Sequence, residues 1–327
     1  MLKYFSAITL AVAVATPALA FEPKRPVEFV VTSGPGGGTD IFARTVQAII
    51  TKHELIGTSV VVTNKGGGSG AEGFVYAAGY KGDPYKLTFG TNNEYLLPSV
   101  AAVPYKPEDL TPIAAMALDE FLIWVNGKSE LADAAAFVEA AKAKPGSIQF
   151  GGSQSKDTDQ ILVSSLAEAV GAEFRYIPFK SGGEATTQLA GGHIDANVNN
   201  PNENRGQWQA GMVKPLCVFR PDRFPQSDAV HDGKGWHDIP TCKEAGIPLE
   251  NYRMPRTVWL PAGVDKDVVA FYRDVLKKVS ETPEWQEYLT KTSLTGQFMV
   301  GDEFQGYIEK DKATVSEVLK REGWLIK

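Results

Sequence analysis

The chain has 327 residues, of which 43% are hydrophobic and 22% are charged, and its formal net charge is −6. A mildly acidic chain without a basic stripe is a poor candidate for a nucleic-acid-binding protein. At about 150 residues per domain, the length predicts two domains, each with an ordinary hydrophobic core.

The first 20 residues have the pattern of a secretory signal peptide. Lys3 supplies a short basic region, residues 5–15 are apolar and uncharged, and Ala18-Leu19-Ala20 matches the A-x-A pattern before a cleavage site. The apolar run is too short to span a bilayer, and no cysteine at the cut offers a site for a lipid anchor. We therefore expect an exported protein that is cleaved after Ala20.

The stretch from Val27 to Arg44 predicts a strand, a glycine turn and a helix. Residues 27–32 are rich in β-branched and aromatic side chains, and Gly36, Gly37 and Gly38 follow. Thr39 and Asp40 are candidate caps for a helix with apolar residues at helical spacing. The backbone N–H groups of such a turn can bind an anion. A tight turn that binds nothing remains the alternative.

Two further strands continue this domain. Residues 59–63 predict a strand that leads into the glycine-rich loop 64–71, and residues 86–90 predict a strand that ends in the polar group Thr91-Asn92-Asn93-Glu94. Strands that alternate with helices indicate βαβ units and a largely parallel sheet. Ligands bind at the carboxyl ends of such strands, so the three loops are expected to converge on one rim.

The middle of the chain repeats this alternation of strands, loops and helices. Pro104 to Pro112 is expected to be a proline-rich connection. The later elements are a strand at 121–125, a helix after Ser129, a strand at 147–150 with the loop 151–155, a helix capped by Asp157 with Gln160, a strand at 175–179, a helix opened by Lys180-Ser181-Gly182-Gly183, a short strand at 194–198, and an asparagine-rich loop with Asn199, Asn200, Asn202 and Asn204.

The last third of the chain is expected to return to the first domain. After an irregular segment at 220–240, residues 256–260 predict a strand, and two long helices begin near Asp265 or Asp267 and near Asp302. We therefore expect two α/β lobes, each a largely parallel sheet flanked by helices. Residues 21–124 and 253–327 form the first lobe and residues 125–252 the second, and two crossings between them act as a hinge.

Cys217 and Cys242 are the only cysteines in the sequence. An exported protein permits a disulfide between them. Cys217 lies in an apolar run that predicts a strand, and Cys242 lies in a loop. A disulfide and two buried thiols both remain open.

Catalytic motifs are weak in this sequence. Gly66 to Ala71 fits G-x-G-x-x-G/A, but the next strand lacks the acidic residue of a dinucleotide site, and no P-loop is present. Ser153-Gln154-Ser155-Lys156 with Lys180-Ser181-Gly182 resembles the motifs of penicillin-recognising serine enzymes, at an unsuitable spacing. No histidine set predicts a metal site. We therefore expect no enzyme activity, no cofactor and no metal.

Anion binding is the chemistry that the remaining features favour. Micromolar affinity requires about 8 kcal/mol, and a charge-assisted hydrogen bond contributes about 1.5–3 kcal/mol, so several groups from both lobes are needed. The candidate loops are 33–40, 66–70 and 152–158. The candidate ligand-binding residues are Ser33, Gly34, Gly36, Gly37, Gly38, Thr39, Gly67, Gly68, Asn92, Gly152, Ser153, Gln154, Ser155, Thr158, Phe179, Asn197 and Asn199.

Seven segments, in order along residues 26–323, carry a family resemblance. They are Gly36-Gly37-Gly38-Thr39-Asp40 with Ala43-Arg44, residues 61–70, Leu110-Thr111-Pro112-Ile113-Ala114, Lys144-Pro145-Gly146, residues 176–185, residues 189–195 and residues 239–246. With these segments the chain resembles the periplasmic solute-binding proteins of tripartite tricarboxylate transporters, the TctC or Bug family.

The resemblance implies a two-lobed Venus flytrap fold in the periplasm. It implies that Ser33 to Thr39 and Gly152 to Ser155 hold a ligand carboxylate, and that the protein delivers it to one large and one small membrane subunit. Asp195 matches a family acid, and we favour a role in fixing its neighbouring loop over ligand contact. Asp40 and Arg44 are expected to form a structural pair. Lys65-Gly66, the amide-rich segment 199–202 and the long segment 220–238 depart from the family pattern.

The sequence therefore predicts a monomeric, exported binding protein for a small mono-, di- or tricarboxylate, with no nucleic-acid partner. Two alternatives remain open at this stage. One is an exported serine-acyl enzyme of the penicillin-recognising type, and the other is a ligand-dependent sensor or adaptor protein.

Overall fold

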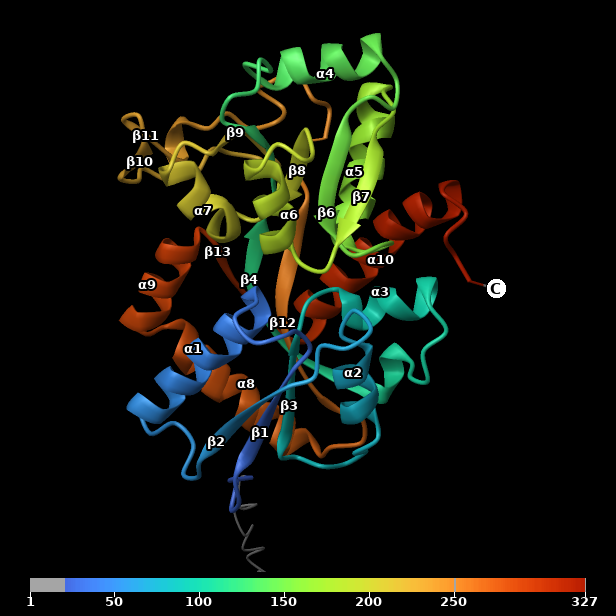
Figure 1. The fold of residues 1–327 in the computed structure, drawn as a ribbon. Helices are drawn as coiled ribbons and strands as arrows, with labels where there is room; N and C mark the ends of the chain where they lie inside the picture. The colour runs from blue at the N-terminus through green and yellow to red at the C-terminus, as the bar shows by residue number, and fades with distance from the viewer. Residues whose placement is uncertain (1–20, 250, 327) are drawn as a thin grey trace, which may run out of the picture.

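The computed structural model describes residues 21–249 and 251–326. The expected signal peptide, residues 1–20, lies outside the described residues. The described chain forms two α/β lobes, one above the other in Figure 1. This two-lobed architecture confirms the expected fold class.

The first lobe is built on a six-stranded sheet with the order β13-β4-β12-β3-β1-β2. Helices cover both of its faces, and apolar clusters fill each interface. Its strands are β1 (Val27–Val31), β2 (Val60–Asn64), β3 (Lys86–Gly90), β4 (Leu110–Glu120), β12 (Arg253–Pro261) and β13 (Thr295–Met299). Its helices are α1 (Gly38–Lys52), α2 (Ala71–Ala78), α3 (Asn93–Val100), α8 (Lys266–Ser280), α9 (Pro283–Thr292) and α10 (Gly301–Arg321), with the short 3₁₀ turn η1 (Pro107–Asp109).

The second lobe is built on a five-stranded sheet with the order β7-β6-β8-β5-β9. Its strands are β5 (Leu122–Asn126), β6 (Gln149–Ser153), β7 (Arg175–Phe179), β8 (Ala196–Asn199) and β9 (Val213–Val218). Its helices are α4 (Ala134–Ala143), α5 (Thr158–Val170), α6 (Gly182–Ala190) and α7 (Pro201–Gln209). A small hairpin of β10 (Ala229–His231) and β11 (Lys234–Gly235), followed by η2 (Trp236–Asp238), occupies the segment expected to be irregular.

Both sheets are mixed, so the expectation of largely parallel sheets is wrong. In the first sheet β1 is parallel to β2 and β3, but β12 is antiparallel to β3 and β4, and β13 is antiparallel to β4. In the second sheet β6 is parallel to β7 and β8, whereas β5 is antiparallel to β8 and β9. The βαβ units supply the parallel strands. The antiparallel strands include those that carry the chain between the lobes.

The crossings between the lobes are short, and a side-chain hydrogen bond lies near each of them. β4 ends at Glu120 and β5 begins at Leu122, so the chain enters the second sheet a few residues before the expected boundary at 124. The side chain of Asn200 donates to the carbonyl of Glu120 at 2.8 Å. Near the return crossing, the hydroxyl of Tyr252 donates to the carbonyl of Thr158 at 2.8 Å.

Two segments differ from the sequence-based expectation. The asparagine-rich segment is not a loop, because Asn199 ends β8 and Pro201 occupies the first turn of α7, where its missing N–H is not needed. The expected connection 104–112 leads directly into β4, an 11-residue strand that includes Pro112. Its alanine-rich sequence carries little strand signal, and pairing on both sides fixes it instead.

Cys217 and Cys242 form a disulfide, with Cα atoms 4.9 Å apart. Both cysteines are fully buried, and Val218 and Thr241 form an isolated parallel bridge beside them. The disulfide therefore closes the segment that contains the β10–β11 hairpin onto the edge strand β9.

Candidate functional site

A cleft of about 520 Å³ lies between the lobes and draws its walls from both. The first lobe contributes the glycine turn after β1, the loop after β2, and Arg256 of β12. The second lobe contributes the segment between β6 and α5 and the start of α6, along with the end of β8. The lining includes ten of the predicted residues: Ser33, Gly34, Gly36, Gly37, Gly38, Thr39, Ser153, Gln154, Thr158 and Asn199.

The turn after β1 delivers the chain into α1 with its first N–H groups at the cleft. Gly37 is the N-cap residue, so Thr39 and Asp40 lie inside the first turn and are not the caps that we expected. The backbone N–H of Gly36 donates to Asp40 Oδ2 at 2.8 Å, and Gly36 has a φ of +77° that favours glycine. Asp40 and Arg44 pair at 2.9 Å, as predicted.

Arg256 is the main group that sequence reasoning missed. Its side chain is 5% exposed, its Nη1 donates to Thr39 Oγ1 at 3.1 Å, and its Nη2 pairs with the buried carboxylate of Asp119. A Cβ on Gly38 would lie 2.5 Å from Nη2, so glycine there makes room for the guanidinium. A cation and a helix N-terminus therefore meet at one end of the cleft. The available signal was an arginine at the start of the strand expected over residues 256–260.

The second-lobe wall begins in a strand and not in the loop that we expected. β6 continues through Gly151 and Gly152 to Ser153, because these residues pair with β7. A Cβ on Gly152 would lie 2.7 Å from the hydroxyl of Tyr176, so this glycine permits close packing and does not line the cleft. Gln154 then takes a left-handed conformation with a φ of 48°.

At the start of α5, the carboxylates of Asp157 and Asp159 accept hydrogen bonds from nearby protein groups. Asp157 is the N-cap residue and accepts from the N–H of Thr158 at 2.6 Å, while Gln160 accepts from Lys156, so the predicted reciprocal capping box does not form. Asp159 reaches back to Ser153 and accepts from its N–H at 2.7 Å and from its hydroxyl at 3.0 Å. The groups of Ser153 that we expected to hold a ligand carboxylate are therefore already engaged.

A further acidic side chain, Glu203 of α7, lies beside the start of α6. Ser181 caps this helix by accepting from the N–H of Glu184 at 3.2 Å. A Cβ on Gly182 would lie 2.1 Å from Glu203 Oε2, so Glu203 of α7 lies directly against this turn. Asn199 lines the cleft, but its amide group donates to Gly182, Thr186 and Asn204, so it fixes the turn.

Burial raises the pKa of the acids along this wall. Desolvation and the nearby charge of Asp157 hold the pKa of Asp159 well above its usual range. Desolvation and the charge of Asp119 raise the pKa of Glu203 to about 7. Of the basic side chains that line the cleft, Arg256 is paired with Asp119 and Lys180 is exposed. The second-lobe wall is therefore acidic.

Seven predicted residues do not line this cleft: Gly67, Gly68, Asn92, Gly152, Ser155, Phe179 and Asn197. From the second glycine loop, Gly66 and Ser69 line the cleft instead of Gly67 and Gly68. The N–H of Gly67 donates to Glu72 at 3.2 Å. Asn92 is buried and its amide oxygen accepts from Thr158 at 3.1 Å, so it joins the lobes. Asn197 is buried below the cleft against Asn204.

The remaining predicted residues have structural contacts of their own. Ser155 is exposed and bonds Gln160 at 3.3 Å, and the carbonyl of Phe179 accepts from the N–H of Gln154 at 2.7 Å. Asp195 accepts from the N–H of Gln149 at 2.8 Å and does not line the cleft. Residues that sequence reasoning did not select include Thr91, Asn93, Lys180, Asn200, Glu203 and Met254.

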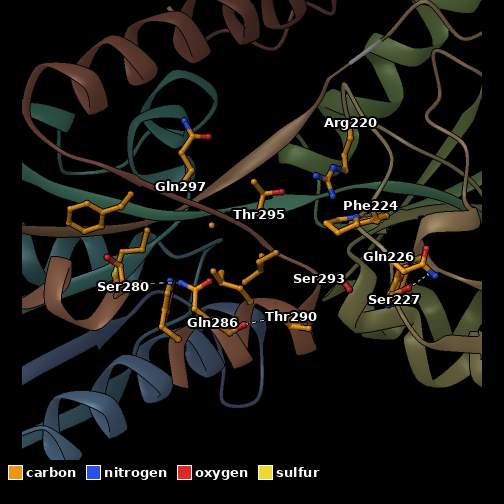
Figure 2. Close-up of a pocket in the computed structure, with 18 residues that line it drawn as sticks. Arg220, Phe224, Gln226, Ser227, Ser280, Gln286, Thr290, Ser293, Thr295 and Gln297 are labelled. Atoms are coloured by element: carbon orange, nitrogen blue, oxygen red, sulfur yellow. Dashed lines mark hydrogen bonds between the residues drawn. The ribbon is translucent and has the colours of Figure 1, made fainter. Parts of the chain in front are cut away.

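A second hollow, of about 560 Å³, lies between the lobes beside β13 (Figure 2). Arg220 and Phe224 of the second lobe face Gln286, Thr295 and Gln297 of the first lobe across it. Arg220 is the one charged residue that lines it, and its Nε lies 3.7 Å from Glu120. None of the glycine loops reaches this hollow, so it lacks the anion-binding groups of the first cleft.

Within the part of the chain that the structure describes, no group of three or more His, Cys, Asp or Glu side chains is placed to hold a metal ion. No helix among those residues has the length and apolar character needed to cross a membrane.

Comparisons with known proteins place the chain in a family. The family model "Tripartite tricarboxylate transporter family receptor" matches residues 42–326. BugT of Bordetella pertussis is 26% identical over 309 residues, which cover 93% of this chain and 91% of BugT. A solved structure described as a periplasmic transporter matches with a TM-score of 0.81 at 28% identity, over 93% of this chain and 99% of the other.

A solved structure from R. palustris with adipate shares the fold. Its TM-score is 0.80 at 24% identity, over 92% of this chain and 98% of the other. The serine-acyl enzyme alternative is wrong, because TctC-family proteins bind substrates and are not enzymes. The matches over most of the chain show that it belongs to the TctC family of tripartite tricarboxylate transporter receptors, which are periplasmic solute-binding proteins.

Proposed function

We propose that this protein captures a small organic carboxylate in the cleft between its lobes and delivers it to one large and one small membrane subunit. The observation that carries the proposal is the junction of the α1 N-terminus with the buried guanidinium of Arg256. Backbone N–H groups at a helix start and an arginine fork both favour a carboxylate.

Two features support this assignment of the site. The cleft takes its walls from both lobes, so a ligand gains hydrogen bonds from each, as micromolar binding requires. The structure from R. palustris contains adipate, a dicarboxylate, in a protein of the same fold. Export, cleavage after Ala20 and a monomeric state are part of the proposal.

Native mass spectrometry of protein purified without refolding tests the proposal first. We expect one small molecule per chain, identified after denaturation as a carboxylic acid. A thermal-shift and calorimetry panel of mono-, di- and tricarboxylates follows, and we expect at least one Kd in the micromolar range. Absence of any carboxylate binding across the panel would overturn the proposal.

Delivery is tested separately from capture. Ligand-loaded protein should bind detergent-solubilised membrane subunits of the transporter more tightly than ligand-free protein does. Capture of a signalling receptor in place of those subunits would favour the sensor alternative and would contradict the delivery step.

A further inference from the structure

The second-lobe wall of the hollow beside β13 is built by a single segment, residues 220–238, which stood out in the sequence for its length. The disulfide between Cys217 and Cys242 joins the two flanks of this segment. Trp236 anchors it further, because its ring packs edge-on against Trp208 of α7 with the ring centres 4.9 Å apart. The lining residues that the segment supplies are Arg220, Phe224, Pro225, Gln226, Ser227 and Trp236. The proposed capture of a ligand in the cleft uses none of these six residues.

Arg220 lies at this hollow with an incomplete set of partners. Its side chain is 14% exposed, and its guanidinium carbon lies 4.7 Å from the centre of the Phe224 ring. Its buried Nε has no hydrogen-bond partner among the described residues, and it lies 3.7 Å from Glu120, which is too far for a hydrogen bond. Figure 2 shows the guanidinium on the side of the hollow that faces Thr295. A largely buried arginine without strong partners is costly, so it indicates a missing acceptor.

Glu120 compensates the charge of Arg220 only in part. Its side chain is fully buried, and its Oε1 accepts from the hydroxyl of Thr295. Burial raises the pKa of Glu120 to about 7, although the charges of Arg220 and Arg253 lower it. Glu120 is not among the residues that line the hollow, and no other acidic residue of the described chain lines it. An anion that enters the hollow therefore meets one positive charge and no negative charge on its walls.

Aromatic and aliphatic side chains from both lobes line the rest of the hollow. Trp285 and Leu289 of α9 and Phe298 of β13 come from the first lobe, and Phe224 and Trp236 come from the second. A volume of about 560 Å³ with mostly apolar walls and a single placed charge is typical of a small-molecule site. A second carboxylate on the ligand would find no cation, because Arg220 is the one basic residue of the described chain that lines the hollow.

We propose that this hollow is a second ligand site, which binds a small aromatic monocarboxylate with its carboxylate on Arg220 and its ring between α9 and residues 220–238. The planar guanidinium donates to a carboxylate in a fork, and the aromatic walls cover the ring. The hollow and the cleft share no lining residue, so the second site does not depend on capture in the cleft.

NMR of the tryptophan indole N–H groups tests the inference on the mature protein. Trp236 and Trp285 line the hollow, and no tryptophan of the described chain lines the cleft. The probes are benzoate, phenylacetate and 3-phenylpropionate, each compared with its primary amide and with adipate. We expect at least one acid to shift both indole signals in a saturable way and to bind about tenfold more tightly than its amide.

Three outcomes of this titration would overturn the inference. They are the absence of any saturable shift of the two signals, equal affinity of acid and amide, and tighter binding of adipate than of every aromatic acid at the same signals. Each of them leaves the proposed capture of a carboxylate in the cleft standing, because that site is tested by its own ligand panel.

Two variants locate the carboxylate and the ring. Arg220→Gln removes the cation and should abolish the preference for the acid over its amide. Thr290→Trp, at an exposed position of α9 on the rim of the hollow, places an indole inside it and should abolish binding of both. Arg223→Gln is the charge-matched control, because Arg223 is half exposed, pairs with Glu244 and does not line the hollow. It should bind like the wild type.

Thermal melting establishes that each variant is folded. Arg220→Gln leaves Glu120 buried without its cation, so Thr290→Trp keeps the inference testable if Arg220→Gln fails to fold. Wild-type affinity in folded Thr290→Trp, or an unchanged preference for the acid in folded Arg220→Gln, would contradict the placement of the ligand in this hollow.

Discussion

The starts of α1 and α5 use the same local structure for opposite electrostatic results. In each, an acid in the first helical turn folds back to a backbone N–H of the preceding segment, Asp40 to Gly36 and Asp159 to Ser153. Asp40 is also paired with Arg44 and accepts from Asn64 at 2.9 Å, so its charge is compensated. Burial raises the pKa of Asp159, and the charge of Asp157 raises it further.

The comparison of α1 with α5 shows that a strand followed by a glycine turn and a helix is not sufficient to form an anion-binding site. What decides the ligand is whether the acid in the first turn has its own cation. At α1 the helix end stays positive and Arg256 reinforces it. At α5 the acid accepts both the N–H and the hydroxyl of Ser153, so these donors are not free for a ligand.

The largest expected effect comes from removing Arg256. Arg256→Gln leaves Asp119 buried without its partner, so we expect a stability loss of about 3–5 kcal/mol and a 10- to 100-fold loss of carboxylate affinity. Urea unfolding and calorimetry measure the two effects. The double variant Asp119→Asn with Arg256→Gln should regain much of the stability and none of the affinity. Recovery of affinity in the double variant would show that Arg256 acts only through folding.

Gly38 at the α1 end and Gly306 of α10 provide a matched pair of glycines, one inside the cleft and one outside it. Gly38→Ala places a methyl group against the Arg256 guanidinium, and we expect a roughly tenfold weaker carboxylate affinity because a charge-assisted contact shifts. Gly306→Ala, on α10 and outside the cleft, has no atom within 4 Å of the new Cβ and should bind like the wild type. Equal affinities for the two variants, measured by calorimetry, would argue against a ligand carboxylate at Arg256.

The pH dependence of carboxylate binding should follow the ionisation of Glu203. Glu203, which faces Asp119, Arg256 and Asn199, has a pKa raised to about 7, so it is protonated below pH 7 and ionised above it. The ionised form repels a ligand carboxylate, so dicarboxylate affinity should fall from pH 5 to 8, by at most tenfold per unit for one group. Calorimetry in buffers of different ionisation enthalpy measures the proton uptake on binding, and Glu203→Gln should flatten the profile.

The smallest expected effect comes from Arg44. Arg44→Ala removes the cation that compensates Asp40 and makes the α1 end resemble the α5 end. Because the arginine is half exposed, its pair is worth roughly 0.2–1 kcal/mol, so we expect a two- to fivefold weaker carboxylate affinity, less at high salt. A larger loss than that of Gly38→Ala would reverse the order of the two contributions.

Much of the fold could be predicted from the sequence because its signals are local. The strand, glycine turn and helix at the start of each βαβ unit follow from apolar periodicity and from caps such as Ser181 and Asp157. β4 and β13 could not be predicted this way, because their sequences are weak strand formers and their pairing partners are distant in the chain. The mixed direction of the sheets follows from those pairings.

The parts of the site that are formed by backbone groups could be predicted from the sequence. The parts that are formed by side chains distant in the sequence could not. The turn from Ser33 to Thr39 lines the cleft because glycine spacing places it at a strand end. Arg256 and Glu203 reach the cleft from elements far away in sequence, so local patterns do not place them there. Asn92 and Asn197 were selected as ligand-binding residues because each amide lies near a strand end. In the structure their amides form hydrogen bonds with Thr158 and Asn204 instead.

The contacts of Thr158 fix the length of ligand that the cleft accepts. Its hydroxyl and carbonyl are bonded to Asn92 and Tyr252, and Asn92 is bonded in turn to Asp311 of α10 at 3.3 Å. The start of α5 is therefore held at a set distance from the first lobe, and a ligand that contacts both walls of the cleft must match that distance. Since each buried methylene is worth about 0.8 kcal/mol, affinity along a homologous series should peak sharply at one chain length.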